Sequence, residues 1–204
     1  MNEPQHPVML FAEPTPMGLI GLAVGCAALT PIAFGVTLTP AALKTAAMLC
    51  LLFGGGCQFL AGVMSLANKN LYGGTLFTAF AFNWVMNWWI LTSIAGGVMP
   101  DHQVLLSVDI CFLLIFSAMT YGFGFFSGLL FVFLLVIDLM YAFKIVAALT
   151  GTAALALPIA ALTIVLGLVA LWIAFALLIN PVAGRVFWFP GPVFRAAPAP
   201  GKAA

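Results

Sequence analysis

Six long apolar runs constrain this chain more than any other feature of its sequence. A helix needs about 20 apolar residues to cross a bilayer, and the runs cover approximately residues 17–36, 43–67, 75–98, 104–121, 125–149 and 157–179. Hydrophobic residues make up 65% of the sequence and charged residues only 5%, too few to cover the surface of a soluble domain. Because lipid offers the backbone no hydrogen bonds, these runs predict an all-α membrane protein with six transmembrane helices.

The connections between the runs are short, so the sequence predicts one transmembrane domain over residues 13–189. A tail of residues 1–12 precedes it, and a Pro- and Ala-rich tail over residues 190–204 is expected to be disordered. Six spans place both termini on one side, and the positive-inside rule chooses the cytoplasm. With the termini in the cytoplasm, four basic residues lie inside and two lie outside. Those inside are Lys69, Arg185, Arg195 and Lys202, and those outside are Lys44 and Lys144. The expected location is the plasma (inner) membrane, as a multi-pass protein in contact with the lipid bilayer.

The composition also argues against several functional classes. Five acidic and six basic residues give a net charge of +1, which provides no basic surface for nucleic acid. No pair of a nucleophile and a base stands out, so we do not expect an enzyme, and no cofactor is indicated. The cysteines lie in apolar runs without metal-ligand spacing, so we expect packing residues and no metal: Cys26, Cys50, Cys57 and Cys111.

A proline-rich start motif leads into the first apolar run. Pro14 and Pro16 fix their own φ and restrict the residues before them, so a helix can begin here but cannot extend backwards. From Gly18 onwards, small residues follow at intervals that allow helices to approach closely. Glu13, just before the prolines, is either a residue that stabilises the helix start or an element that selects at a gate.

Two sequence blocks resemble those of the acetate uptake transporter family, the acetate and succinate permeases of microbes and yeasts. Pro14-x-Pro16-Met17-Gly18-Leu19 is similar to the family's Asn-Pro-Ala-Pro-Leu-Gly-Leu signature. Residues 53–62 and 70–84 are similar to its Gly-Gly-x-x-Gln-x-x-Ala-Gly and Gly-x-Thr-x-Phe-x-x-Tyr-Gly-x-Phe-Trp blocks. The resemblance covers roughly residues 13–188. It implies six-helix protomers, each with its own pore, in a homo-oligomer that is a hexameric ring.

The resemblance also implies where the pore is narrowest. The family's tunnel is closed by an aromatic residue, a tyrosine and a leucine, which correspond here to Leu22, Phe80 and Val136. All three positions remain apolar, so a dry constriction is expected. The aromatic ring at the first position and the tyrosine hydroxyl are replaced. The start motif departs from the family as well, because Glu13 stands in place of its asparagine.

Polar residues inside the spans are further candidates for the substrate path. Asn83 and Asn87 share one helical face with Phe80, because they follow it at intervals of three and four residues. Amides facing lipid are costly, so this face is expected to look into protein or a hydrated path. Two interpretations remain open for these asparagines and for Gln58: hydrogen bonds between helices, or N–H donors for a carboxylate.

Two aspartates lie within the apolar runs, where an ionisable side chain is by default a functional hypothesis. Asp109 and Asp138 are each about 14 residues from the predicted turn between the fourth and fifth spans, so similar depths are expected. If they face one another they would tend to share a proton, which suits proton coupling. The alternative is that each bonds a neighbour such as Lys144 or a backbone group.

Taken with the resemblance, these features favour a channel or transporter for acetate or another small monocarboxylate, with or without proton coupling. A neutral-solute channel for urea, short amides or ammonia is an alternative, because no basic residue is apparent in the membrane core. A structural or regulatory membrane subunit without transport is the other alternative, and it would explain the altered gate and start motif.

Overall fold

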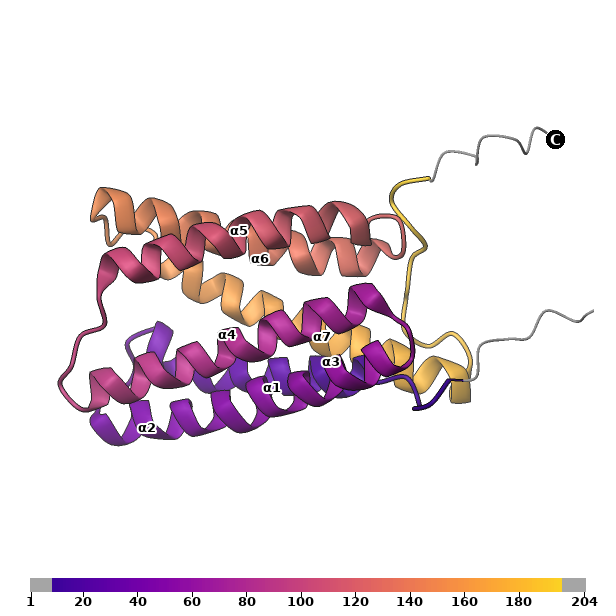
Figure 1. Ribbon diagram of the computed structural model, residues 1–204, viewed down its shortest axis with the longest axis horizontal. Coiled ribbons are helices and arrows are strands. Elements are labelled where there is room, and N and C mark those ends of the chain that lie inside the picture. The colour runs from indigo at the N-terminus through magenta and orange to yellow at the C-terminus, as the bar shows by residue number, and fades with distance from the viewer. Residues whose placement is uncertain (1–8, 196–204) are drawn as a thin grey trace, which may run out of the picture. The chain divides into compact units, whose positions relative to one another are not determined.

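The computed structural model describes residues 9–195, and the regular elements in this range are all helices. The chain divides into two compact units, Met1–Pro100 and Asp101–Ala204, here called unit 1 and unit 2. Figure 1 shows the order of the helices along the chain. Each unit is described by itself below.

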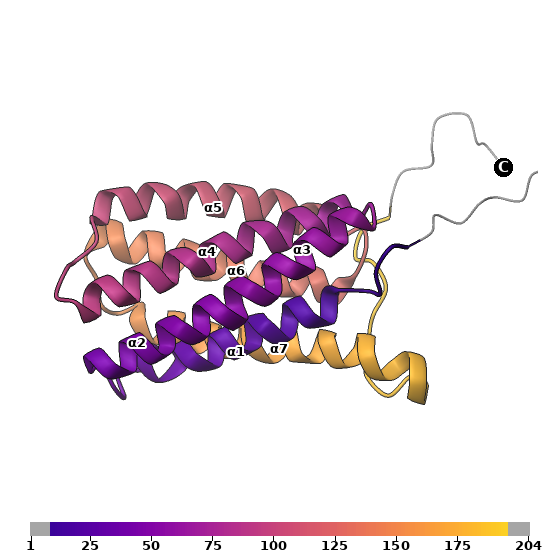
Figure 2. The same ribbon diagram turned by 60° about the horizontal axis from the view of Figure 1, so that its bottom comes forward.

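Unit 1 contains three long helical rods that run side by side (Figures 1 and 2). The first is α1 (Thr15–Ala33), and the third is α4 (Leu71–Ala95). The second is continuous over 28 residues and comprises α2 (Pro40–Leu49), the π-helix η1 (Cys50–Cys57) and α3 (Gln58–Ala67). The π-helix holds three consecutive glycines, Gly54 to Gly56. Its wide turns were not predicted, and such turns in other proteins often mark functional sites.

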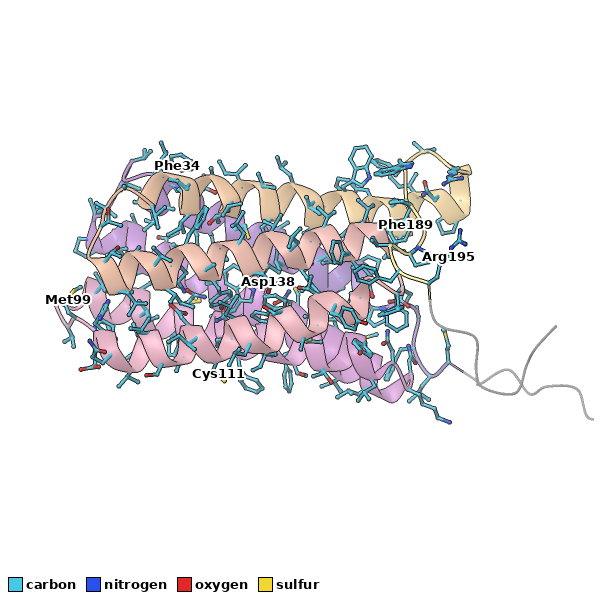
Figure 3. All side chains as sticks on the ribbon, turned by 90° about the horizontal axis from the view of Figure 1, so that it is seen from above. Phe34, Met99, Cys111, Asp138, Phe189 and Arg195 are labelled. Atoms are coloured by element: carbon cyan, nitrogen blue, oxygen red, sulfur yellow. The ribbon has the colours of Figure 1, made fainter. Side chains whose placement is uncertain are left out.

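In unit 1, polar side chains cap the N-termini of α2 and α4, just before each apolar run begins. Thr39 Oγ1 accepts a hydrogen bond from Ala42 N and caps α2, and Asn70 Oδ1 accepts one from Gly73 N and caps α4. Between α3 and α4 the chain reverses through Lys69, whose φ is 62°. This reversal over residues 68–70 is one of the short connections that the sequence predicts. At the other end of unit 1, Phe34 and Met99 lie in its two other loops (Figure 3).

Glycines allow the rods of unit 1 to touch. The Trp84 indole lies where a Cβ would project from Gly54, and it lies 2.7 Å from the corresponding point at Gly25. In the same way, Phe77 lies 2.5 Å from a Cβ position at Gly18. Rings from α4 thus fill the spaces that the missing side chains leave, as small residues in membrane helices permit.

Unit 2 contains a hairpin of α5 (His102–Phe123) and α6 (Gly128–Thr150), followed by α7 (Ala156–Ala183). Asp101 and Ser127 cap α5 and α6 by accepting hydrogen bonds from Val104 N and Leu130 N. The Tyr141 ring on α6 packs against Phe112 and Phe116 on α5, with centroids 5.8 and 5.6 Å apart. Figure 1 shows α5 and α6 lying along one another.

The segment after α7 folds back on unit 2 and is held by hydrogen bonds. Asn180 Oδ1 accepts from Phe187 N at 2.8 Å, and the Trp172 indole N–H donates to the Trp188 carbonyl at 2.9 Å. Further on, Val193 N and Phe194 N donate to the Gly124 carbonyl in the turn between α5 and α6, at 2.8 and 2.9 Å. Figure 3 marks Phe189 and Arg195 in this segment.

This order corrects part of the sequence analysis, which predicted disorder from residue 190 onwards. The Phe194 ring packs against Tyr121, Phe125 and Phe131, with centroids 5.3 to 5.6 Å apart. Composition alone missed this because the partners come from distant parts of unit 2. Residues 196–204, including Lys202, lie outside the described residues.

Five helical spans among residues 9–195 are long and apolar enough to cross a membrane. They are Thr15–Ala33, Pro40–Ala67, His102–Phe123, Gly128–Thr150 and Ala156–Ala183. The predicted third span corresponds to α4, which is 25 residues long but does not reach the same apolarity because it carries Asn83, Asn87 and several threonines and glycines. Pro31 lies two residues before the end of α1.

Candidate functional site

The start motif fixes the beginning of α1. The Glu13 carboxylate accepts hydrogen bonds from Thr15 N at 3.1 Å and from the Thr15 hydroxyl, which favours the role of a helix-start residue. Pro14, Pro16 and Gly18 are buried. These four residues therefore stabilise the first turn of α1 and pack it against the rest of unit 1. A role of Glu13 at a gate stays a prediction.

The residues just before the start motif are tied to the end of α3. Asn68 Oδ1 accepts a hydrogen bond from Phe11 N at 2.9 Å, and Asn68 Nδ2 donates to the Phe11 carbonyl at 3.0 Å. These two hydrogen bonds join the segment before α1 to Asn68, the residue directly after α3. Position 13 is thereby held at one end of unit 1.

Two of the three predicted gate residues lie at the same depth in unit 1. Leu22 and Phe80 are buried, with 0% and 5% of their surfaces exposed. Gly21, beside Leu22, faces the Cys57 side chain, and the Ala81 carbonyl, beside Phe80, lies 3.5 Å from a Cβ position at Gly55. Both gate residues thus stand at the level of η1.

The third predicted gate residue, Val136, lies on α6 in unit 2, where its side chain is partly exposed. A constriction made of all three residues therefore stays a prediction. What the structure adds is the common depth of the two members in unit 1, which sequence spacing alone did not give.

Gln58 lies at the end of η1, in the middle of the packed rods. Its side chain is 0% exposed, and neither Oε1 nor Nε2 has a hydrogen-bond partner among the described residues. Gly54, four residues earlier, faces Trp84, and Gly62, four residues later, faces Thr78. Gln58 therefore lies on the face of its rod that meets α4, at nearly the same level as Leu22 and Phe80. A buried amide without partners is uncommon and needs a reason.

The two asparagines of α4 are bonded to one another along the helix. Asn87 Nδ2 donates to the Asn83 carbonyl at 3.0 Å and to Asn83 Oδ1 at 3.2 Å. This confirms that they share a face. Because both contacts use the Asn87 amide group, Asn87 is less available to a ligand than Gln58.

The two membrane aspartates have separate partners. Asp109 accepts from Lys144 Nζ at 2.9 Å, as the alternative in the sequence analysis proposed. Asp138 Oδ2 accepts from Thr120 Oγ1 at 2.6 Å, between α6 and α5 (Figure 3), while Oδ1 has no hydrogen-bond partner among the described residues. Thr120 follows Asp109 by three turns of α5, roughly 16 Å, which places the carboxylates too far apart to share a proton. The interpretation of a shared proton is therefore wrong, because α5 and α6 are staggered so that Asp138 meets Thr120 and Asp109 meets Lys144.

All four cysteines are free thiols, with Cys26 and Cys50 buried and Cys111 exposed on α5 (Figure 3). Within residues 9–195, no three His, Cys, Asp or Glu side chains gather in a way that would hold a metal ion.

Two partnerless polar groups escaped the sequence analysis. The Trp84 ring packs against Gly25 and Gly54, but its buried Nε1 has no hydrogen-bond partner among the described residues; neither has Ser65 Oγ. Ser65 follows Gln58 by seven residues, the spacing of one helical face. That spacing was the signal available in the sequence.

Five apolar spans, a polar interior in unit 1 and short connections define a multi-pass integral membrane protein. Its fold is that of a solved membrane channel. The structure described as that of the bacterial acetate channel SatP matches with a TM-score of 0.78 and 22% sequence identity, over 89% of this chain and 99% of that one. No protein-family model matches the chain, and no curated protein matches it either.

Proposed function

We propose that this protein is a membrane channel or transporter for acetate or another small monocarboxylate. The observation that carries the proposal is the buried, partnerless Gln58 amide at the depth of Leu22 and Phe80, in a chain whose fold matches an acetate channel. An amide N–H is a suitable donor for a carboxylate. Apolar side chains at the same depth provide a barrier that excludes other ions.

The proposed path passes Leu22 and Phe80 in unit 1, and the resemblance to the family implies Val136 as the third residue of the constriction. Gln58 is its central polar side chain, and Asn83 and Asn87 continue the polar face along α4. The resemblance of the sequence blocks supports a hexameric ring in which each protomer has its own path. The division of basic residues supports cytoplasmic termini in the plasma (inner) membrane.

Flux into proteoliposomes tests this function. Protein-containing vesicles are expected to take up radiolabelled acetate at least about tenfold faster than empty vesicles, while urea enters both at similar rates. Faster entry of urea without acetate would instead establish a neutral-solute channel. Entry of neither solute, with protein shown to be folded and inserted, would favour the non-transporting subunit.

We propose that proton coupling of this transport uses Asp138 and not Asp109. The Asp109 carboxylate is bound to Lys144, whereas Asp138 keeps one buried oxygen without a hydrogen-bond partner among the described residues. In Asp138→Asn, the dependence of acetate flux on pH is expected to follow the titration of the substrate alone. The measurement is initial flux across pH 5 to 8 at constant concentration of undissociated acid.

Asp109→Asn serves as the contrast to that variant. It removes the charge that faces Lys144, so it is expected to lower thermal stability while leaving the shape of the pH profile unchanged. If Asp138→Asn keeps the wild-type profile, Asp138 has only the structural role of binding Thr120.

A further inference from the structure

The hydroxyl group of Thr120 on α5 makes two hydrogen bonds. Thr120 Oγ1 lies 2.9 Å from the Phe116 carbonyl oxygen, one turn earlier on the same helix, and 2.6 Å from Asp138 Oδ2 on α6. Only 6% of the Thr120 surface is exposed, so these two oxygen atoms are its neighbours in the interior of unit 2. Each of the two contacts needs a proton between its oxygen atoms.

A count of protons decides which group donates in each contact. A hydroxyl group has one proton to donate and lone pairs that accept. The Phe116 carbonyl has no proton, so Thr120 must donate that bond. With an ionised Asp138, both contacts would compete for the single Thr120 proton. With a proton on Asp138 Oδ2, Asp138 donates to Thr120 Oγ1, Thr120 donates to Phe116, and both bonds form together.

The second oxygen of Asp138 supports the same assignment. Oδ1 is buried and has no hydrogen-bond partner among residues 9–195. An ionised carboxylate spreads its charge over both oxygens, and a buried charged oxygen without a partner costs more than a neutral one. A neutral acid with its proton on Oδ2 leaves only a carbonyl oxygen unbonded.

The charged side chains of unit 2 do not offer Asp138 a counter-ion. Asp109 and Lys144, on α5 and α6, are bonded to one another. The helix α7, which also packs against α6, contains no Asp, Glu, Lys, Arg, His, Cys or Tyr. Arg185 and Arg195, in the segment after α7, are exposed.

Four further titratable side chains belong to α5 and α6. The Tyr121 and Tyr141 rings pack against phenylalanine rings, and His102 and Cys111 precede Thr120 by more than two turns of α5. Thr120 is therefore the polar side chain that the structure places on the Asp138 carboxyl group.

We infer that Asp138 and Thr120 form a proton-binding site between α5 and α6, in which Asp138 Oδ2 holds the proton and donates it to Thr120 Oγ1. When the proton leaves to water, the Thr120 hydroxyl turns from the Phe116 carbonyl to the Asp138 carboxylate. Thr120 is thus a positioning residue that binds Asp138 in both states, and Phe116 exchanges one of its bonds with each change. The part that this site plays in transport rests on the proposed function, whereas the bound proton does not.

Infrared spectroscopy detects this proton without a transport measurement. A protonated carboxylic acid absorbs at a C=O frequency separate from those of carboxylates and amides, and the spectrum is simple because the chain has only five acidic residues. At pH 7 an ordinary aspartate is ionised. Wild-type protein at this pH, in a detergent without ester groups, is expected to show a carboxylic acid band that Asp138→Asn removes.

Labelling of the aspartate carboxyl groups with ¹³C assigns the band to an aspartate even if Asp138→Asn does not fold. A wild-type spectrum without the band, a band that does not respond to this label, or a band that survives in folded Asp138→Asn overturns the inference.

Variants of Thr120 test its positioning role. Thr120→Val keeps the shape of the side chain but removes the acceptor of the Asp138 proton, so the band is expected to move to higher frequency. Thr120→Ser restores the hydroxyl and is expected to restore the wild-type frequency. Thr150→Val is the matched control, because the Thr150 hydroxyl makes the same bond to a carbonyl one turn earlier, that of Val146, away from any carboxylate. A band that stays in place in folded Thr120→Val rejects Thr120 as the partner of the proton.

Flux measurements separate this inference from the proposed function. In Thr120→Val, the midpoint of the pH profile of acetate flux is expected to shift by about one pH unit toward higher pH, because the ionised carboxylate loses its donor; Thr120→Ser is expected to reverse the shift. If the infrared band is present but wild-type vesicles carry no carboxylate, the proposed function fails and the proton-binding site stands. If vesicles carry acetate but the band is absent, the site is rejected and the proposed function stands.

Discussion

Gly54→Ala is expected to lower the free energy of unfolding by about 2 kcal/mol, the range of overpacking in a filled core. The added methyl group would overlap the Trp84 indole, which lies against Gly54. The far edge of that ring packs over Gly25 on α1, where it lies 2.7 Å from the point that a Cβ would occupy, so α1 limits how far the ring can shift. The measurement is thermal or denaturant-induced unfolding in mild detergent, followed by tryptophan fluorescence.

Gly56→Ala is the matched control, since it makes the same change two residues later in η1. A Cβ at Gly56 meets nothing closer than the Leu51 carbonyl oxygen at 3.7 Å, an ordinary contact. Alanine is a better helix former than glycine by up to about 1 kcal/mol, so this variant is expected to be as stable as the wild type or more so. Equal losses for the two variants would show that the glycines serve the π-helix backbone and not the packing of Trp84.

Phe80→Ala is expected to increase the leak of small carboxylates by about tenfold or more. Phe80 is 5% exposed and lies at the same depth as Leu22, so its ring forms much of the apolar barrier in unit 1. Removing the ring leaves a cavity that admits water and solute and ends the exclusion that a dry constriction imposes. Initial efflux of acetate from preloaded vesicles measures the effect.

Phe82→Ala is the control for this prediction, because Phe82 is two residues away on the same helix but 63% exposed. Loss of a buried ring costs about 3 to 5 kcal/mol, so Phe80→Leu is included as a milder variant with an intermediate leak. If folded Phe80→Ala and Phe82→Ala proteins leak equally, Phe80 does not belong to the barrier.

The arrangement of the spans was largely predictable from the sequence. The apolar runs correspond to the observed helices within a few residues at most ends, since the polar residues that interrupt the runs also cap the helices, as Thr39 and Asn70 do. The Asp109–Lys144 ion pair was predictable as an alternative, because an unpaired charge in an apolar surrounding is costly and an opposite charge lowers that cost. What spacing could not give was the stagger of α5 against α6, and for that reason the similar depths expected for Asp109 and Asp138 were wrong, while the alternative of separate partners is confirmed.

Other features depend on contacts between distant segments. The order of residues 190–195 comes from the Gly124 carbonyl and from rings on α5 and α6, which composition does not report. The common depth of Leu22, Phe80 and Gln58 depends on how three rods pack in unit 1. The π-helix was not predictable from the sequence, because three consecutive glycines are compatible with several backbone conformations.

The π-helix also fixes the phase of everything that follows it in its rod. A π turn accommodates about one residue more than an α turn, so Gly54 to Gly56 act as a spacer whose length sets the direction of later side chains. Converting one π turn to α-helix without deleting a residue would rotate α3 by about 100° relative to α2, whereas deleting one glycine at the same time would largely keep the phase. In the first case Gln58 and Ser65 would turn away from α4, and their places would pass to apolar neighbours. A protein of this design can therefore change the lining of its interior through the form of one helix turn, without replacing any side chain of that lining.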